Sequence, residues 1–535
     1  MPAGRDPARR PASARRRGLL VLAPLLSGLL YGLCFPPHDL FLLGWLALVP
    51  LLWAWRQVGP AGGALLGTLA GAAGASVAVR WLLVPLTHAY GFPWPLALAF
   101  FAGIALYIGL FYGALGAVVS WLHRRQTPWP LLWVPAAWVA GELARARLGP
   151  GVPWLFAGHT QGELLPLVQL AELTGVFGIS FLVVAGNQAL VQVRRGGGLA
   201  PVLGVALAVG GALLYGGQRL AAVTAAEGRA APLHVAVVQP NIPQREKWDR
   251  DRFVPAMRRL YALTQEALRH AGEPPAPPPD LVVWPETALT VDLEGAAPTL
   301  APVLRLFAGT EAQLLLGAPR VLRGPAGEHV RNSAALFGAD GRRLGVYDKR
   351  HLLPFGEYYP GWLTELPGLR PLVTRHMGET EFTAGGREPL LVAKSIPFVT
   401  TICYEAAYPE LIAEGIAGGG RFLVNLTNDA WFEGSAGAAQ HLAMARLRTV
   451  ETRTPLVRAA NTGISAVVAA TGRTLGRLEL DEQGVLAATI HPGPAGSPYT
   501  RWGDRFAIGC AAFVPLPFFA SRWRRRGSPL GQRST

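Results

Sequence analysis

Charged residues and cysteines are both scarce in this 535-residue chain. Only 16% of its residues are charged and 51% are hydrophobic, whereas an average soluble domain has about 25% charged residues. The three cysteines, Cys34, Cys403 and Cys510, form no CxxC pair. Neither a disulfide framework nor a cysteine-rich metal site is therefore expected, and the composition argues against a soluble protein.

Acidic residues are also few, 34 against 49 basic ones, which gives a net charge of +15. A basic chain can bind nucleic acid, so the location of the positive charge decides whether such a partner is expected. The tail up to Arg17 holds six arginines and one aspartate, and the tail after Ser521 holds five arginines and no acid, so the two tails supply +10 of the +15. Basic segments beside apolar runs are typical of cytoplasmic flanks in membrane proteins. No nucleic-acid partner is expected.

Apolar runs separated by short polar loops fill the first 220 residues. A helix needs about 20 residues to cross a hydrocarbon core about 30 Å thick. We expect seven spans here and one near the C-terminus: Leu19–Phe35, Leu40–Trp55, Gly63–Val79, Trp94–Leu122, Pro130–Leu143, Leu167–Val193, Leu199–Tyr215 and Phe506–Ala520. The arginines of the loops then place both tails in the cytoplasm and the segment after Tyr215 outside it. A cleaved signal peptide is the alternative for the first span, but further spans follow at once.

The pattern of apolar and polar residues changes between residues 232 and 492. Short β-rich runs alternate there with amphipathic stretches such as Arg252–His270 and Gln440–Thr452; the runs are His234–Gln239, Leu281–Trp284, Gln313–Gly317, Asn332–Phe337, Phe398–Cys403, Phe422–Asn425, Val457–Ala460 and Ser465–Ala470. This alternation predicts a layered α/β domain. The expected organisation is a basic cytoplasmic tail (1–17), a membrane domain (18–220), a catalytic domain (232–492), a membrane helix (505–521) and a second basic tail (522–535).

Two features admit a structural and a functional interpretation. The apolar, proline-bearing stretch Tyr358–Thr374 is either a loop packed on the core or a mobile arm that enters lipid or gates a substrate entrance. Arg145, Arg147, Glu142 and Glu163 are expected near the outer mouth of the membrane domain, as interface charges or as contacts to a lipid headgroup.

Three residues stand at the ends of predicted strands, where α/β folds usually place chemistry. Glu286 follows an apolar strand and is either a helix-start charge or a general base. Lys349 is either a solvated surface residue or a donor to an oxyanion. Cys403 closes a β-rich run, so its thiol should lie at a strand-to-helix turn, where backbone N–H groups are expected to lower the thiol pKa from about 8.5 and to hold an oxyanion.

Together these segments resemble the Glu-Lys-Cys constellation of the nitrilase superfamily, the carbon–nitrogen hydrolases. With seven spans before this domain and one after it, the chain resembles the apolipoprotein N-acyltransferase family over nearly its whole length. The phrases that carry the likeness include Cys34-Phe35-Pro36-Pro37, Gly151-Val152-Pro153-Trp154, Asn425-Leu426-Thr427-Asn428 and Gln440-His441. One departure is Glu433-Gly434 after Trp431-Phe432, where the family usually runs straight to glycine.

The resemblance implies an αββα sandwich on a helical membrane bundle and a two-step acyl transfer. A phospholipid acylates Cys403 as a thioester, and the amine of a diacylglyceryl-cysteine at the N-terminus of an apolipoprotein then takes the acyl group. In this scheme Glu286 is the general base and Lys349 holds the oxyanion. Glu357 and Glu405 are implied as supporting carboxylates, Asn332 as a polar site residue, and Trp248 and Tyr404 as lining residues.

The same resemblance implies an enzyme of the inner membrane whose catalytic domain faces the periplasm. We expect it to need no metal or cofactor and to act as a monomer in the bilayer. Two other functions stay open from the residues alone. A membrane-tethered amidase acting on a small amide would use the same triad. A lipid transporter with an appended domain is disfavoured because the spans hold almost no ionisable groups.

Overall fold

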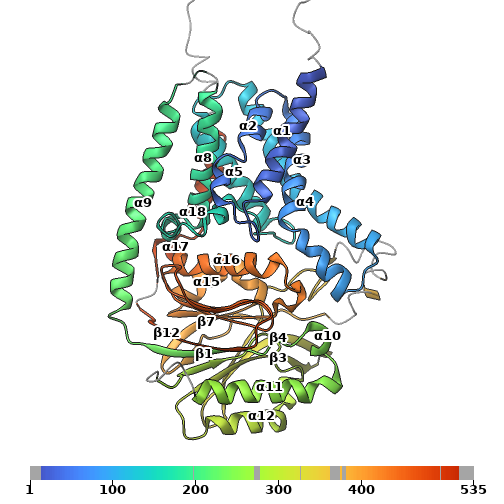
Figure 1. The fold of residues 1–535 in the computed structure, drawn as a ribbon, viewed down its shortest axis with the longest axis vertical. Coiled ribbons are helices and arrows are strands. Elements are labelled where there is room, and N and C mark those ends of the chain that lie inside the picture. Colours follow the sequence, from blue (N-terminus) through green and yellow to red (C-terminus); the bar gives the residue numbers. More distant parts are fainter. Residues whose placement is uncertain are drawn as a thin grey trace, which may run out of the picture.

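The computed structural model describes residues 14–516 apart from 195, 197, 270–276, 326, 362–370, 372–373, 376–380 and 494–495. A helical bundle forms one half of the molecule and a two-sheet α/β domain forms the other (Figure 1). The bundle contains α1 (Ala14–Gly32), η1 (Phe41–Trp45), α2 (Val49–Trp55), α3 (Pro60–Ala78), α4 (Trp94–Arg124), α5 (Pro130–Arg147), α6 (Leu165–Val168), α7 (Ala171–Thr174), α8 (Val176–Val193), α9 (Ala200–Glu227) and α18 (Arg505–Phe513).

Among the described residues, four helices are long and apolar enough to cross a membrane: α3, α4, α8 and α9. Other predicted spans are helical but shorter, broken or charged. The run Leu40–Trp55 forms η1 and the short α2, and the run Leu167–Val193 is broken at Gly175, whose φ of +63° ends α7. Helix α5 carries Glu142, Arg145 and Arg147 near its end.

Small residues allow a close contact between two helices of the bundle, α3 and α4. A Cβ atom on Gly67 of α3 would lie 2.1 Å from the carbonyl oxygen of Tyr112 in α4, and one on Gly63 would lie 2.3 Å from the carbonyl oxygen of Gly116. No larger side chain fits at these two positions, so the glycines allow α3 and α4 to approach each other backbone to backbone, as is common between helices in membranes.

Two six-stranded sheets form the core of the α/β domain. The first has the order β12-β1-β2-β3-β4-β5 and the second has the order β11-β10-β9-β8-β7-β6. The strands are β1 (Leu233–Gln239), β2 (Leu281–Val283), β3 (Gln313–Gly324), β4 (Gly327–Phe337), β5 (Arg343–Asp348), β6 (Leu391–Ala393), β7 (Ile396–Ile402), β8 (Phe422–Thr427), β9 (Leu456–Ala460), β10 (Ser465–Val468), β11 (Thr474–Leu478) and β12 (Gly484–Ile490).

Helices cover the outer faces of both sheets. Helices α11 (Arg250–Arg269) and α12 (Ala297–Leu304) lie on the first sheet, and α15 (Pro409–Ala417) and α16 (Ala436–Thr452) lie between the second sheet and the bundle (Figure 1). Apolar side chains such as Val237, Phe398 and Phe422 fill the space between the sheets. The layers confirm the αββα sandwich, and they put the second sheet and its helices against the membrane half.

All eight β-rich runs of the sequence form strands, and both amphipathic stretches form helices, α11 and α16. No residue range was predicted for β5, β6, β11 or β12, although Lys349, which follows β5, was expected at the end of a strand. Most of the expected arm, Tyr358–Thr374, lies outside the described residues, as do most of the first basic tail and all of the second. The last predicted span is described only as far as residue 516.

Candidate active site

The three predicted catalytic residues lie at the ends of strands from both sheets. Glu286 follows β2, and Lys349 is the first residue after β5 in the first sheet. Cys403 is the first residue after β7 in the second sheet and opens the 3-10 helix η7 (Cys403–Ala407). The sandwich thus brings together three residues that are separated by 117 positions of sequence.

Donors surround the buried carboxylate of Glu286. Its Oε1 accepts from Asn332 Nδ2 at 2.7 Å and lies 3.5 Å from Lys349 Nζ. Its Oε2 accepts from the backbone N–H of Asn428 at 2.8 Å. These contacts orient the carboxylate, as preorganised catalysis requires.

Lys349 lies between two carboxylates. Its side chain is 1% exposed, and Nζ is 2.8 Å from Glu357 and 3.5 Å from Glu286. Burial disfavours the ammonium, but Glu357 and Glu286 outweigh this effect and raise the pKa of Lys349 above its ordinary value. Asn332 bridges the same two carboxylates, because its Nδ2 also donates to Glu357 at 2.9 Å. Lys349 therefore supplies a permanent positive charge beside the nucleophile.

The backbone of Cys403 adopts φ +50°, in the left-handed region. Such a conformation costs a residue other than glycine about 1–3 kcal/mol and persists only where neighbours enforce it. Glu405, two residues later, accepts from the N–H of Ile402 at 2.8 Å and from the N–H groups of Arg350 and His351 at 2.7 and 3.0 Å. Glu405 therefore ties the turn at the nucleophile to the segment that carries Lys349.

The expected lowering of the thiol pKa is wrong. Burial, together with the negative charge of Glu286, raises the pKa of Cys403 far above its ordinary value, and Lys349 only partly opposes this. The helix that Cys403 opens is a five-residue 3-10 turn, too short to supply a strong dipole. The resting nucleophile is a thiol, so its proton has to leave during the reaction.

A second buried lysine, Lys247, was missed by sequence reasoning. Its Nζ donates to the backbone carbonyl of Glu286 at 2.9 Å, and burial lowers its pKa to about 7. A compositional signal was present: the chain has only three lysines, Lys247, Lys349 and Lys394, among 49 basic residues. Two of these three lysines contact Glu286.

The two expected lining residues lie in different surroundings. Tyr404 is buried, donates to the carbonyl of Gly151 at 3.1 Å and stacks on Trp154, with ring centroids 6.2 Å apart. Both partners belong to the loop after α5, so Tyr404 joins the active site to the bundle. Trp248 follows Lys247 but is 51% exposed, so it lies at the surface near the site.

The four charges expected at the outer mouth of the bundle are all engaged by protein groups. Arg145 is 1% exposed and donates to the carbonyl of Leu155 at 3.0 Å, and Glu142 accepts from the N–H of Ala157 at 2.7 Å. Arg147 is paired with Asp504, and Glu163 with Arg446 at 2.6 Å. Arg145 and Glu142 thus hold the loop that carries Trp154 and are not solvated interface charges.

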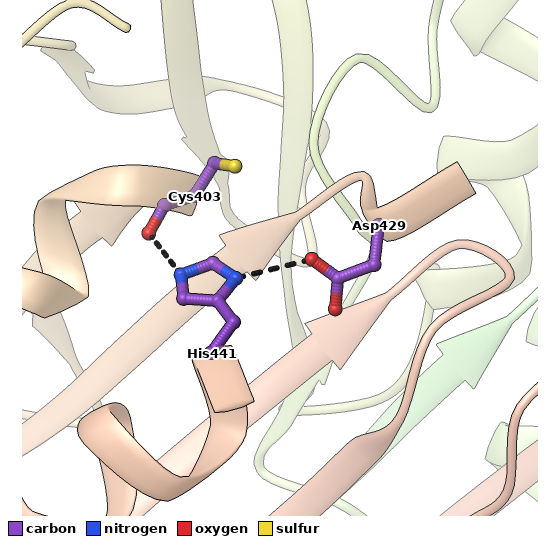
Figure 2. A group of neighbouring side chains, drawn as sticks. All are labelled: Cys403, Asp429 and His441. Atoms are coloured by element: carbon purple, nitrogen blue, oxygen red, sulfur yellow. Dashed lines mark hydrogen bonds and ion pairs between the residues drawn. The ribbon is translucent and has the colours of Figure 1, made fainter. Parts of the chain in front are cut away.

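A cluster of Cys403, His441 and Asp429 lies on the bundle side of the nucleophile. Figure 2 shows the thiol pointing away from the imidazole, whose Nε2 instead lies 2.9 Å from the carbonyl oxygen of Cys403. His441 is therefore not placed to take the thiol proton. Asp429 is paired with the guanidinium of Arg458 at 2.6 Å, a cation that opposes a metal ion, so this cluster does not fit a metal site.

Family models match both halves of the chain. Residues 27–189 match the family model described as apolipoprotein N-acyltransferase N-terminal domain, and residues 234–497 match that of carbon-nitrogen hydrolase. The structure is also similar to Nit3 of Saccharomyces cerevisiae, a nitrilase-superfamily member, with a TM-score of 0.37 and 17% identity over 53% of this chain and 95% of that one.

Curated relatives match almost the full length. The apolipoprotein N-acyltransferase of Geobacter metallireducens is 34% identical over 504 residues, which cover 92% of this chain and 93% of that protein. The enzyme of the same name from Methylococcus capsulatus is 31% identical, covering 96% of this chain and 98% of that protein. Both domains and the full-length match lead to one conclusion: the chain belongs to the apolipoprotein N-acyltransferase family.

Proposed function

We propose that this protein transfers a fatty acyl chain from a membrane phospholipid to the N-terminal amine of a diacylglyceryl-cysteine on an apolipoprotein. The observation that carries the proposal is the position of Cys403. Its thiol interacts electrostatically with the buried pair of Glu286 and Lys349. The next residue, Tyr404, packs on a loop of the membrane bundle. A nucleophile between a catalytic carboxylate and a membrane domain suits an acyl group that arrives from lipid.

In the first step Glu286 takes the proton of the Cys403 thiol as sulfur attacks the ester carbonyl of the phospholipid. The oxyanion that forms receives hydrogen bonds from Lys349 Nζ and the backbone N–H after Cys403; one such donor is typically worth about 3–4 kcal/mol. Collapse of the tetrahedral intermediate breaks the ester C–O bond. The lysophospholipid leaves with the proton from Glu286, and the acyl group remains as a thioester.

In the second step the amine of the lipoprotein attacks the thioester. Glu286 takes a proton from the attacking nitrogen, Lys349 again holds the oxyanion, and the thiolate of Cys403 leaves and recovers the proton. The product is an amide, which is more stable than a thioester, so transfer is downhill. Asn332 and Glu357 hold the side chains of Glu286 and Lys349 in position through both steps.

The setting follows from the same scheme. The substrates are both lipids, so we place residues 18–220 and 505–521 in the inner membrane and the catalytic domain, 232–492, on its periplasmic face. The basic tails, 1–17 and 522–535, then lie in the cytoplasm. We place exposed Trp248 at the edge of the site, in reach of a substrate, and propose that the enzyme works as a monomer.

The test separates transfer of the acyl group to the lipoprotein amine from its hydrolysis. The purified enzyme is given labelled phospholipid with and without a synthetic diacylglyceryl-cysteine peptide. We expect the label to appear in amide linkage on the peptide, and lysophospholipid to stop accumulating after one turnover when the peptide is absent. Continuous release of free fatty acid without the peptide, and none on the peptide when it is present, would contradict the proposal.

A further inference from the structure

One glutamine of the catalytic domain uses its whole hydrogen-bonding capacity on the membrane bundle. Gln440, in α16, is 4% exposed. Its Oε1 accepts from the indole N–H groups of Trp81 and Trp154 at 3.0 and 2.8 Å. Its Nε2 donates to the carbonyl oxygens of Pro36 and Ala78 at 2.7 and 2.8 Å. A single side chain therefore binds three separate segments of the bundle.

The next residue, His441, turns in the opposite direction, toward the nucleophile. Its Nε2 lies 2.9 Å from the carbonyl oxygen of Cys403 (Figure 2). A carbonyl oxygen can only accept, so Nε2 carries the proton. Burial, followed by the charge of Arg458, lowers the pKa of His441. Its Nδ1 lies 3.1 Å from both Asp429 Oδ1 and Arg458 Nη2.

Asp429 and Arg458 hold the ring of His441 in place. Both are fully buried, and their side chains are 2.6 Å apart. Arg458 also donates to Asn425, whose Nδ2 binds Thr401 Oγ1 at 3.0 Å. The imidazole is thus fixed by groups on β8, β9 and the segment after β8, and its direction toward Cys403 is determined by the second sheet.

The carbonyl that His441 binds belongs to the strained residue. Cys403 needs an external restraint to keep φ at +50°. His441 binds the carbonyl of Cys403, whereas Glu405 binds the N–H of the preceding residue, Ile402. Trp154, from the loop after α5, packs directly on this part of the catalytic domain. The centroid of its ring lies 6.2 Å from the ring centroids of both His441 and Tyr404. The same indole donates to Gln440.

We propose that Gln440 and His441 form a positioning pair that sets the direction of the Cys403 thiol according to the seating of the catalytic domain on the membrane bundle. The bundle then contributes to catalysis through this pair as well as by holding lipid. Neither residue touches the reacting atoms. The inference rests on the proposed role of Cys403 as the acyl carrier.

The experiment measures thioester formation on Cys403 from labelled phospholipid in nanodiscs, with rate and KM determined separately. A misplacement of about 1 Å can reduce a rate about 100-fold. We expect a loss of about this size in Gln440→Met and in His441→Leu, with KM little changed. His441→Gln keeps a donor at the position of Nε2 and should recover most of the rate, which a general packing defect would not allow.

Gln169→Met is the matched control. Gln169 is also fully buried and also joins the two halves, because it binds Thr471 O at 3.0 Å and Arg453 at 2.6 Å, away from Cys403. It should acylate at nearly the wild-type rate. If Gln169→Met is slowed as much as Gln440→Met, the contacts are merely structural and the inference is wrong.

Trp81→Phe removes only one of the four bonds of Gln440 and covers the case in which Gln440→Met does not fold. We expect an intermediate rate; a wild-type rate in folded Trp81→Phe and Gln440→Met would overturn the inference. Failure of the proposed function looks different. In that case wild-type Cys403 gains no acyl group at all, or Cys403→Ala retains full transfer.

Discussion

Replacing Lys349 by methionine separates electrostatic catalysis from structural support at this site. Lys349 Nζ is the only buried cation between Glu286 and Glu357 among the described residues, at 3.5 and 2.8 Å. Loss of one oxyanion donor reduces turnover by about 10²–10³-fold. Loss of one partner of a buried ion pair destabilises a protein by about 3–5 kcal/mol. We expect the destabilisation of Lys349→Met to lie at the lower end of this range. Asn332 still donates to both carboxylates, and one of the carboxylates can take up a proton.

The assay is single-turnover acylation of Cys403 followed by mass spectrometry, with thermal unfolding measured in parallel. Lys394→Met is the control, since Lys394 pairs with Asp280 but is about half exposed, and such pairs contribute about 0–1 kcal/mol. Adding Glu357→Gln to Lys349→Met removes one uncompensated charge, so the double variant should regain stability without regaining activity. Wild-type acylation in folded Lys349→Met would refute the oxyanion role.

Further predictions concern the titrating groups of the site. Glu286→Gln should abolish thioester formation yet speed alkylation of Cys403 by iodoacetamide, because the charge of Glu286 raises the thiol pKa; the thiolate fraction grows about tenfold for each unit that the pKa falls, and unchanged or slower alkylation would contradict this electrostatic assignment. Lys247→Met should gain stability relative to the wild type as the pH falls from 10 to 7. The unfolded chain keeps the Lys247 proton up to about pH 10.5 and the folded chain releases it near 7, so the wild-type fold loses stability over this range; parallel unfolding curves of the two proteins at both pH values would show the assignment to be wrong.

The sequence predicted the layers and the catalytic strand ends because both depend on local patterns. Apolar runs such as His234–Gln239 identify strands, and polar residues directly after them, such as Glu286 and Cys403, stand at strand ends whatever the tertiary packing. The missed strands β5, β6, β11 and β12 are the four edge strands of the two sheets, and their burial is mixed. Their residues show no period-two pattern strong enough to identify them.

The electrostatics of the site could not be predicted in the same way. The thiol pKa of Cys403 depends on burial and on Glu286, which is 117 positions away, and the sequence pattern showed only the turn after β7. The pairing of His88 with Glu433, 2.6 Å apart, is also invisible in sequence. Glu433 is the residue at which this sequence departs from the family pattern, and His88 of the bundle is its partner.

The central claim is that Cys403 carries the acyl group, and mass spectrometry of the intact and digested protein tests it most directly. After exposure to phospholipid and no acceptor, we expect one alkali-labile fatty acyl group on Cys403, none on Cys34 or Cys510, and none in Cys403→Ala. Addition of the diacylglyceryl-cysteine peptide should remove it in a single turnover. An unmodified Cys403, or an acyl group on another residue that the peptide removes, would contradict the account.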